Sequence, residues 1–282
     1  MKNRENRESS RVSEQMNKSV AQHFIDHVEW LDSEGKRGRQ FVSMPIVLSG
    51  FNFEDYNISK ANFSNLCLEG ASLGHRKSLT GIKFIDTKLN KSSLKNTSLF
   101  DCDLRLADVS GSEIENVVFW RCNFSKALLN EIEASNSIRF VLCKLKNASF
   151  IKAQLNEAVF DTVNLERANF TNAHLNGARF LHSDLGFTRA YQANFREADL
   201  SNADLSNTDC SEANFIDANL KGANLTNTNL TRANLNRVDF SETRIDEANF
   251  RQADLRRATF NRKDRQMADF GGADLAGVNW VD

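Results

Sequence analysis

Residues 193–225 read ANFREADLSNADLSNTDCSEANFIDANLKGANL, in which Phe or Leu returns at every fifth position with one exception. The same spacing runs from Phe140 to Trp280, where 24 of the 29 positions are Leu or Phe. We call each such position a centre. The residue two before a centre is usually Ala, and Asn or Asp commonly stands between the two. An internal repeat of five residues therefore organises this part of the chain.

The repeat continues upstream with two shifts of phase. Centres follow one another every five residues over 48–73, then over 79–134, and again from Phe140 onward. Each shift equals one residue. Single insertions are therefore expected near 74–78 and 135–139.

A period of five fits neither an amphipathic helix, which repeats at about 3.6, nor a strand, which repeats at about 2. A square coil fits it, with four five-residue sides in each turn. The centre and the residue two before it would then point inward. At the ~4.8 Å spacing of paired strands, about 11 to 12 coils would form a rod roughly 55 Å long. The pattern predicts an all-β solenoid, in which each coil buries its core only against its neighbours.

The repeated pattern A(D/N)(L/F)xx resembles the pentapeptide-repeat family. This resemblance implies a right-handed quadrilateral β-helix over about residues 46–282. The stretch 27–38, HVEWLDSEGKRG, also resembles the HxxWLxSxGxxG segment that precedes the repeats in many bacterial members. It implies a cap that shields the open edge of the first coil. We expect a disordered leader at 1–10, a helical cap and connector at 11–45, and repeats at 46–282.

The N-terminal segment carries apolar residues at three- or four-residue steps between Val12 and Leu31. This spacing predicts an amphipathic helix over about residues 11–33, closed by Gly35. At about 1.5 Å per residue it would be about 33 Å long, enough to cap the first coil or to lie along several coils. His23 and His27 are one helical turn apart and could hold a metal ion, but no third ligand is evident.

Residues 20 apart, or 21 apart across an insertion, should stack into columns. One inward column is rich in aromatic residues and reads Leu99, Phe119, Phe140, Phe160, Phe180, Leu200, Leu220, Phe240, Phe260 and Trp280. Cys102, Cys122 and Cys143 share a second column, each two residues before a centre. Metal or redox chemistry is one interpretation of this column. We prefer the other, in which each Cys replaces a small inward Ala and is inert.

The remaining cysteines add little chemistry. Cys67 is expected to point outward. The five cysteines are an odd number and lack the paired short spacings of a zinc site or a disulfide framework. Reduced thiols are therefore expected.

One outward region is apolar. Phe100, Trp120 and Val141 each follow a centre on three successive coils, and Val118 and Leu142 lie beside them. Monomeric proteins seldom expose such a patch. Either the chain's own N-terminal segment covers it, or it binds a protein partner with Trp120 as the anchor.

One late unit breaks the inward pattern. It reads RKDRQ and places Lys263 and Arg265 where a small residue and Leu belong. Burying both charges unpaired would cost on the order of several kcal/mol each, so we predict an outward loop. Together with neighbouring arginines the loop would form a basic cluster, either solvated or able to bind an anion or an acidic partner. The cluster would comprise Arg256, Arg257, Arg262, Lys263 and Arg265.

The C-terminal end of the rod shows no helical pattern that would close it. Trp280 would plug this end, or two rods would meet there. The second interpretation gives an end-to-end homodimer through the C-terminal coil.

Charge and hydropathy exclude several broad classes of partner. The 36 Lys and Arg nearly balance the 37 Asp and Glu, so we expect neither direct nucleic-acid binding nor a membrane partner. No stretch approaches the ~20 apolar residues of a membrane span, and no apolar signal follows the charged start, so a cytoplasmic location is expected. The net charge is +4 over 76–150 and −4 over 190–282, which gives a mild dipole along the rod.

Three functional hypotheses follow. We expect no catalytic residue, cofactor or metal, because the rod has no large cleft and no nucleotide-binding or zinc motif occurs. The first hypothesis is a non-enzymatic binding or scaffold module for an unidentified protein partner. The family resemblance implies the alternative, a DNA mimic that binds and inhibits or protects DNA gyrase or topoisomerase IV. Such mimics are strongly acidic along one side, whereas this chain is nearly neutral and basic in the middle. A third hypothesis is a secreted effector, which the sequence neither supports nor excludes.

Overall fold

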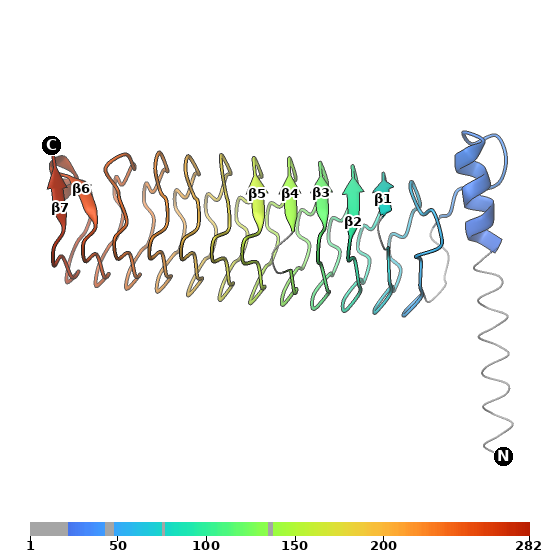
Figure 1. The fold of residues 1–282 in the computed structure, drawn as a ribbon, viewed down its shortest axis with the longest axis horizontal. Helices are drawn as coiled ribbons and strands as arrows, with labels where there is room; N and C mark the ends of the chain where they lie inside the picture. Colours follow the sequence, from blue (N-terminus) through green and yellow to red (C-terminus); the bar gives the residue numbers. More distant parts are fainter. Residues whose placement is uncertain (1–21, 43–47, 75–76, 135–137) are drawn as a thin grey trace, which may run out of the picture.

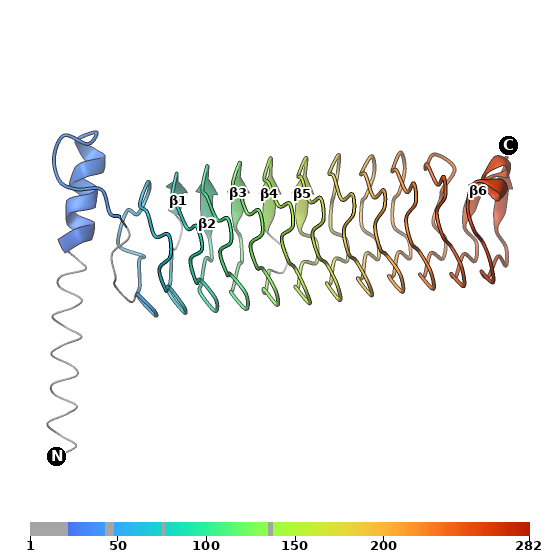
Figure 2. The same ribbon diagram turned by 180° about the vertical axis from the view of Figure 1, so that it is seen from behind.

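The computed structural model describes residues 22–42, 48–74, 77–134 and 138–282. They form a rod of stacked coils, with a helix at the N-terminal end and the C-terminus at the opposite end (Figures 1 and 2). The rod is a right-handed quadrilateral β-helix, as predicted. The predicted leader at 1–10 and the first part of the predicted helix, 11–21, lie outside the described residues.

Short parallel strands mark one side of the stack. β1 to β5 form a five-stranded sheet in chain order, and β6 pairs with β7 near the C-terminus. The bounds are β1 Lys77–Thr80, β2 Thr97–Phe100, β3 Val118–Trp120, β4 Arg139–Val141, β5 Val159–Asp161, β6 Thr259–Asn261 and β7 Asn279–Val281. A 3-10 helix, η1, spans Arg262–Gln266, and the N-terminal helix is described over 22–32. Isolated parallel bridges hold the other sides of the coils in register.

Each five-residue unit ends in a tight turn, as the unit centred on Leu165 shows. The Ala168 N–H donates to the Leu165 carbonyl over 2.8 Å, and Arg167 between them has a left-handed φ of 59°. In the next unit, the Oδ1 atom of Asn169 accepts the Thr171 N–H at 3.0 Å. A side-chain oxygen at this position thus orders the following turn. The repeated pattern of small residue, Asn or Asp, and large residue therefore specifies two inward side chains and one corner.

The register of the coils confirms both insertions. Lys83 pairs with Asp103, 20 residues later. Across the first insertion Asn62 pairs with Lys83, and across the second Asn123 pairs with Lys144, each 21 residues later. A single added residue therefore shifts the count while the inward positions stay aligned.

Flat stacks of aromatic rings fill the interior. The rings of Phe140, Phe160 and Phe180 stack with centroids 5.1 and 4.8 Å apart. Phe150 and Phe170 reach in from the opposite side and meet this stack edge-on, at interplanar angles of 83° to 89°. The predicted aromatic-rich column is buried along its whole length except in the last coil. Both arrangements are favourable for aromatic pairs.

Hydroxyl groups are tolerated inside because the backbone binds them. Thr208 Oγ1 donates to the Leu185 carbonyl over 2.9 Å, and Thr228 Oγ1 donates to the Leu205 carbonyl over 2.7 Å. Both threonines are buried and lie two residues before a centre. A buried donor that finds a carbonyl avoids the cost of an unsatisfied polar group.

The N-terminal helix covers the first coil with Phe24, whose ring stacks on Phe41 at 4.7 Å. Its other ring contacts, at 5.1 to 6.3 Å, are with Phe51, Phe53, Tyr56 and Phe63. Phe24 therefore packs on aromatic residues of the first coil, and the capping role of this segment stays a prediction.

Two residues of the cap are fixed by the backbone. His27 is fully buried, and its Nδ1 accepts the Phe41 N–H at 3.0 Å, so Nε2–H donates to the Ser59 carbonyl at 2.8 Å. Gly38 has a left-handed φ of 65°, and a Cβ there would lie 2.2 Å from the Asp26 carbonyl oxygen. Only glycine fits this close approach.

Candidate functional site

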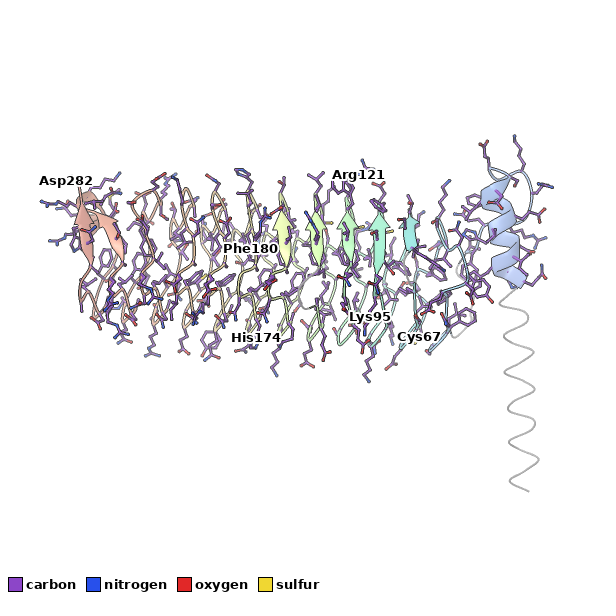
Figure 3. All side chains as sticks on the ribbon, viewed as in Figure 1. Cys67, Lys95, Arg121, His174, Phe180 and Asp282 are labelled. Atoms are coloured by element: carbon purple, nitrogen blue, oxygen red, sulfur yellow. The ribbon has the colours of Figure 1, made fainter. Side chains whose placement is uncertain are left out.

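The four sides of the coil give the rod four faces, which we number in chain order from the face that carries β1 to β5. The centres that define them in the middle coils are Phe119 and Phe140 for face I, Phe124 and Leu145 for face II, Leu129 and Phe150 for face III, and Ala134 and Leu155 for face IV. Side chains that follow or precede a centre by one residue point away from the core, as the alternating burial shows. Phe180 lies inside the rod, whereas Arg121 projects from its upper edge in Figure 3.

Face I carries the predicted apolar patch. Phe100 pairs with Trp120 across β2 and β3, and Trp120 pairs with Val141 across β3 and β4. Trp120 is 37% exposed, and Phe100 and Val141 are half-buried. The pleat of the sheet turns these three side chains outward while the neighbouring centres point inward. The structure thus brings together the three residues that the column arithmetic had aligned.

The patch extends further than the sequence interpretation placed it. Val118 and Leu142 border it as expected, with Leu142 47% exposed. Val159 adds a further half-buried apolar side chain. It lies in the same column as Val118, with Arg139 between them, because Arg139 pairs with both. Val159 precedes the centre Phe160, so the same arithmetic could have found it. We call Phe100, Val118, Trp120, Val141, Leu142 and Val159 the face I patch.

The described part of the N-terminal segment does not cover the face I patch. Its helix stands beyond the end of the coil stack, and β1 and β2 lie between it and β3 (Figure 1). Its contacts are with the first coil, through Phe24 and His27. Within the described residues, Trp120 is left accessible.

The unit at Arg262–Gln266 turns outward, as predicted. η1 replaces the regular corner, and Lys263 and Arg265 are both exposed. Asp264 is buried instead, and its Oδ2 accepts the Asn261 N–H at 3.0 Å. This contact is half of a reciprocal capping pair between Asn261 and Asp264, which holds the start of the turn.

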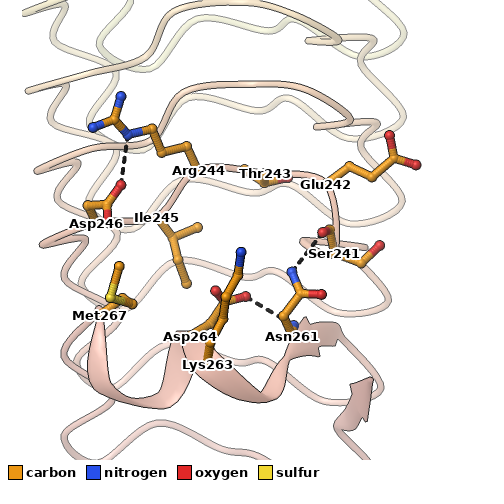
Figure 4. A pocket seen from close by; sticks show the side chains of 10 residues that line it. All are labelled: Ser241, Glu242, Thr243, Arg244, Ile245, Asp246, Asn261, Lys263, Asp264 and Met267. Atoms are coloured by element: carbon orange, nitrogen blue, oxygen red, sulfur yellow. Dashed lines mark hydrogen bonds and ion pairs between the residues drawn. The ribbon is translucent and has the colours of Figure 1, made fainter. Parts of the chain in front are cut away.

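A surface hollow of about 330 Å³ lies beside η1. Figure 4 shows Lys263 and Asp264 on the η1 side of this hollow, with an ion pair between Arg244 and Asp246 of the preceding coil on the other. The Arg244 Nε and Asp246 Oδ2 atoms are 2.7 Å apart. Charges of both signs therefore line the hollow.

The five basic residues do not form the single cluster that the sequence suggested. Arg256 and Arg257 follow a face IV centre and line a different hollow from Lys263. Arg256 is paired with Asp254 at 2.7 Å, and Arg262 with Asp282 at 2.9 Å. Carboxylates on the same and neighbouring coils neutralise much of the expected positive charge, because the repeat places Asp before so many centres.

The C-terminal coil is partly closed by its own residues. Trp280 stacks on Phe260 with ring centroids 5.4 Å apart, and the Arg265 guanidinium lies 4.3 Å from the Trp280 ring centroid. A cation over an aromatic face is attractive. Met267 and Leu275 in the same coil remain exposed. Arg265 thus contributes to the end of the rod besides displaying a charge.

The cysteine column lies in the core. Cys102, Cys122 and Cys143 are at most 2% exposed, and the thiols of Cys122 and Cys143 each donate to a carbonyl at 3.3 Å, as inward hydroxyls do. The hydrogen bond with Cys122, followed by burial, raises the pKa of Cys102. A bond with Cys102 favours the Cys122 thiolate, but its bond with Cys143 and burial together raise the pKa of Cys122 to about 12. Cys67 is half-buried and faces outward, as predicted.

The structure gives no support to a metal site at the two histidines of the cap. Both ring nitrogens of His27 are bound to the backbone, so neither is available as a ligand. In the part of the chain that the structure describes, no three His, Cys, Asp or Glu side chains gather as a metal ion requires. No helix among the described residues is long and apolar enough to cross a membrane.

Family models match most of the chain. Residues 112–190 and 193–270 match the model described as a pentapeptide repeat region, and residues 47–74 and 78–116 match the model described as pentapeptide repeats. None of the curated proteins matches the chain.

Solved structures include several similar chains. HetL, a pentapeptide repeat protein involved in heterocyst differentiation regulation from the cyanobacterium Nostoc sp. strain PCC 7120, is 26% identical, with 81% of this chain and 88% of that chain covered and a TM-score of 0.34. QnrB1, a plasmid-mediated fluoroquinolone resistance protein, is 21% identical, with 73% and 89% covered and a TM-score of 0.33. Rfr23, a pentapeptide repeat protein from the cyanobacterium Cyanothece 51142, is 29% identical, with 42% and 63% covered and a TM-score of 0.30.

Proposed function

The chain belongs to the pentapeptide-repeat family, and from that premise we propose that it is a non-enzymatic binding or scaffold module that presents a rigid rod to a protein partner. The observation that carries the proposal is the face I patch, a run of outward apolar side chains on successive coils. Asp161 ends the run at the position after the next face I centre, and in the later coils this position holds Leu181, Ser201, Lys221 and Ser241. The apolar run is therefore a local departure and not a requirement of the fold.

Energetics favour a protein partner for this patch. Exposed aromatic and branched side chains gain free energy when a partner removes them from water, at about 25 cal/mol per Å² of apolar surface. Trp is also among the residues that most often dominate binding energy at protein interfaces. The coils hold the patch rigid, so little conformational entropy is lost when a partner binds. The exposed Lys263 and Arg265 at η1 form a second, lesser candidate surface for an acidic partner.

A pull-down from native lysate tests the proposal. The wild-type chain is compared with the double variant Phe100→Asp, Trp120→Asp, and bound proteins are identified by mass spectrometry. The matched control is Leu181→Asp, Ser201→Asp, which places charges at the same position after the face I centre on later coils. All three proteins must first show the same melting curve.

The two outcomes have different consequences. A partner that is retained by the wild type and the control but lost from the Phe100→Asp, Trp120→Asp variant supports a binding module that acts through face I. Identical partner lists from all three baits would reject the face I patch and direct attention to η1 and the C-terminal coil.

Gyrase or topoisomerase IV would be the partner under the alternative hypothesis. The paired carboxylates of the later coils argue against a DNA mimic, which requires a continuous uncompensated acidic surface. Asp217, for example, is paired with Arg237, and Asp269 with Arg251. An end-to-end homodimer through the C-terminal coil is compatible with either function, and the exposed Met267 and Leu275 are its supporting residues. Light scattering of the chain and of a Leu275→Asp variant would test it.

A further inference from the structure

We propose that the face I patch, with the basic side chains beside it, binds an acidic amphipathic α-helix of the partner, laid along the rod axis. This inference rests on the proposed function and names the chemistry of the partner. Three properties of the described residues support it: the spacing of the patch, the unpaired positive charge on faces I and II, and the negative charge on face IV.

The spacing of the patch suits a helix. Phe100, Trp120 and Val141 lie on successive strands, which are about 4.8 Å apart along the rod. One helical turn rises about 5.4 Å, so residues i, i+3 or i+4, and i+7 of a helix parallel to the rod would meet successive coils. An extended segment is less suitable, because its side chains on one face recur at about 6.8 Å and lose register with the coils within a few residues. The strands of the patch are also already paired on both sides, which leaves no edge for an added strand.

Unpaired basic side chains flank the patch. Arg139 lies within the sheet between Val118 and Val159, and Lys144 follows Leu142 onto face II. Both are exposed, and neither forms an ion pair with any described residue. Lys83 is also exposed, and it belongs to the same face II column as Lys144. Backbone bridges join this column in the order Lys83, Asp103, Asn123 and Lys144.

The carboxylates near the patch are, by contrast, already neutralised. Among the described residues from 77 to 166 on faces I and II, every carboxylate except Asp86 is within 4 Å of a basic side chain, and Glu115 and Glu157, at the corner between face IV and face I, form no ion pair with a described residue. The pairs are Asp101 with Arg121, Asp103 with Arg105, Asp161 with Arg179, and Glu166 with Lys146 and Arg167. The net charge that this side offers to a partner is therefore positive.

Face IV, which adjoins face I and lies opposite face II, is acidic in the same coils. Glu113 pairs through its backbone with Glu133 on face IV, and Glu115 and Glu131 occupy the corners beside them. All four are exposed, and only Glu113 among them has an ion pair, with Lys95 at 2.7 Å. An acidic partner is thus attracted to face I and repelled from face IV. Charge complementarity of this kind orients an encounter.

Selection from a peptide library on the full chain tests the partner chemistry. A phage library of random 16-residue peptides is panned on the wild type in the presence of excess Trp120→Asp variant, which removes peptides that bind elsewhere. Enriched peptides are then synthesised, and their dissociation constants are measured by fluorescence anisotropy. The variants are Trp120→Asp and the double variant Arg139→Glu, Lys144→Glu. The matched control is Arg189→Glu, an exposed arginine on a later coil that forms no ion pair with a described residue.

We expect enriched peptides with apolar residues at helical spacing and an excess of Asp and Glu. We expect Trp120→Asp and the Arg139→Glu, Lys144→Glu variant each to weaken binding at least about tenfold, with Arg189→Glu unchanged. Affinity should also fall as salt rises. Peptides that need Trp120 but are neutral, basic or apolar at alternate positions would overturn this inference and leave the proposed function standing. Failure to enrich any peptide that depends on Trp120 would also overturn this inference, while the pull-down, which does not depend on peptide binding, decides the proposed function.

Discussion

The coils of residues 77–161 and those of residues 163–255 share one core but differ in what they show to solvent. Inside, both place a large apolar residue at most centres and usually a small one two residues earlier. Outside, the later coils place Asp199, Asn219 and Asp239 where the middle coils place Val118 and Val159. On face I, for example, Asn219 Nδ2 donates to Asp199 Oδ1 at 2.9 Å. The inward pattern therefore carries the fold, and departures at the outward positions carry the information about function.

The two regions also differ in how regular their strands are. Regular strands β2 to β5 occur where outward positions hold branched or aromatic residues, which favour a pleated backbone. Over 163–255 the coils are joined by isolated bridges. The face I patch is thus both the most apolar and the most sheet-like part of the described outer surface of these coils.

The largest effect is expected from charges placed in the shared core. Leu104→Asp in the middle coils and Leu225→Asp in the later coils should each destabilise the rod by about 3–5 kcal/mol, because both side chains are fully buried. Asn227→Asp, at an exposed corner, should change stability by less than about 0.5 kcal/mol. Thermal melts compare the three variants. Equal melting temperatures for Leu225→Asp and Asn227→Asp would refute the inward assignment, and unequal losses for the two core variants would show that the cores are not equivalent.

A smaller effect is expected from loosening the cap, which lies nearer the middle coils. A Cβ at Gly38 would meet backbone atoms at 2.2 and 2.8 Å, whereas a Cβ at Gly70 would meet nothing within 4 Å. Both have left-handed φ, so Gly70→Ala should cost about 1–2 kcal/mol and Gly38→Ala more. Hydrogen exchange should show faster opening of residues 48–100 than of 163–255 in Gly38→Ala. Matching exchange profiles for the two variants would contradict the close approach at Gly38.

Low pH should lower the stability of the same cap by a smaller amount. Burial lowers the pKa of His27, although the hydrogen bond to the Ser59 carbonyl opposes this shift. A lowered pKa in the folded state means that the unfolded chain binds the proton more readily, so stability is present above the ordinary value of about 6.5 and declines as pH falls below it. Protonated Nδ1 also cannot accept the Phe41 N–H. Because intrinsic amide exchange itself slows as pH falls, the measurement compares protection factors: those of residues 24–41 should fall between pH 7.5 and pH 5.5 in the wild type and should not fall in His27→Gln.

Much of this architecture could be predicted from the sequence, because the position of a residue within the repeat determines its place in the coil. The two insertions, the inward aromatic column and the outward turn at η1 all followed from counting in fives. The arithmetic also aligned Phe100, Trp120 and Val141, and only the limit of the patch at Val159 was missed.

Ion pairs could not be predicted by counting positions in the repeat. Nothing in the spacing of Arg256 indicates that it lies 2.7 Å from Asp254, because a long side chain chooses among several carboxylates only in three dimensions. Two members of the expected basic cluster, Arg256 and Arg262, are for this reason partly neutralised. The contact of Arg265 with Trp280 could not be predicted from the sequence either, because it depends on the position of η1 relative to the last coil.

Thiol chemistry should distinguish the regions without changing stability. Cys102, Cys122 and Cys143 lie inside the middle coils, whereas Cys67 is half-buried near the first coils. Hydrogen bonds with Ser49 and with the Glu69 backbone lower the pKa of Cys67, which raises the fraction of reactive thiolate below pH 9. Iodoacetamide should therefore modify Cys67 in the native chain and all five cysteines in denaturant. Mass spectrometry after labelling identifies the sites, and early modification of Cys122 would show that the inward column opens.

The last prediction is that the protein does not change the supercoiling activity of gyrase. A DNA mimic needs an acidic surface that the protein itself leaves uncompensated. In the later coils, where net negative charge resides, many carboxylates are already held by basic side chains. The pairs are Glu197 with Arg196, Glu212 with Arg232, Asp217 with Arg237, Glu242 with Lys221, Asp246 with Arg244, Asp254 with Arg256, Asp269 with Arg251 and Asp282 with Arg262. Supercoiling should stay unchanged at micromolar protein. Inhibition that survives Trp120→Asp but disappears when Asp184, Asp204 and Asp209 are replaced by Asn would move the binding surface from the middle coils to the later ones and reverse the comparison between them.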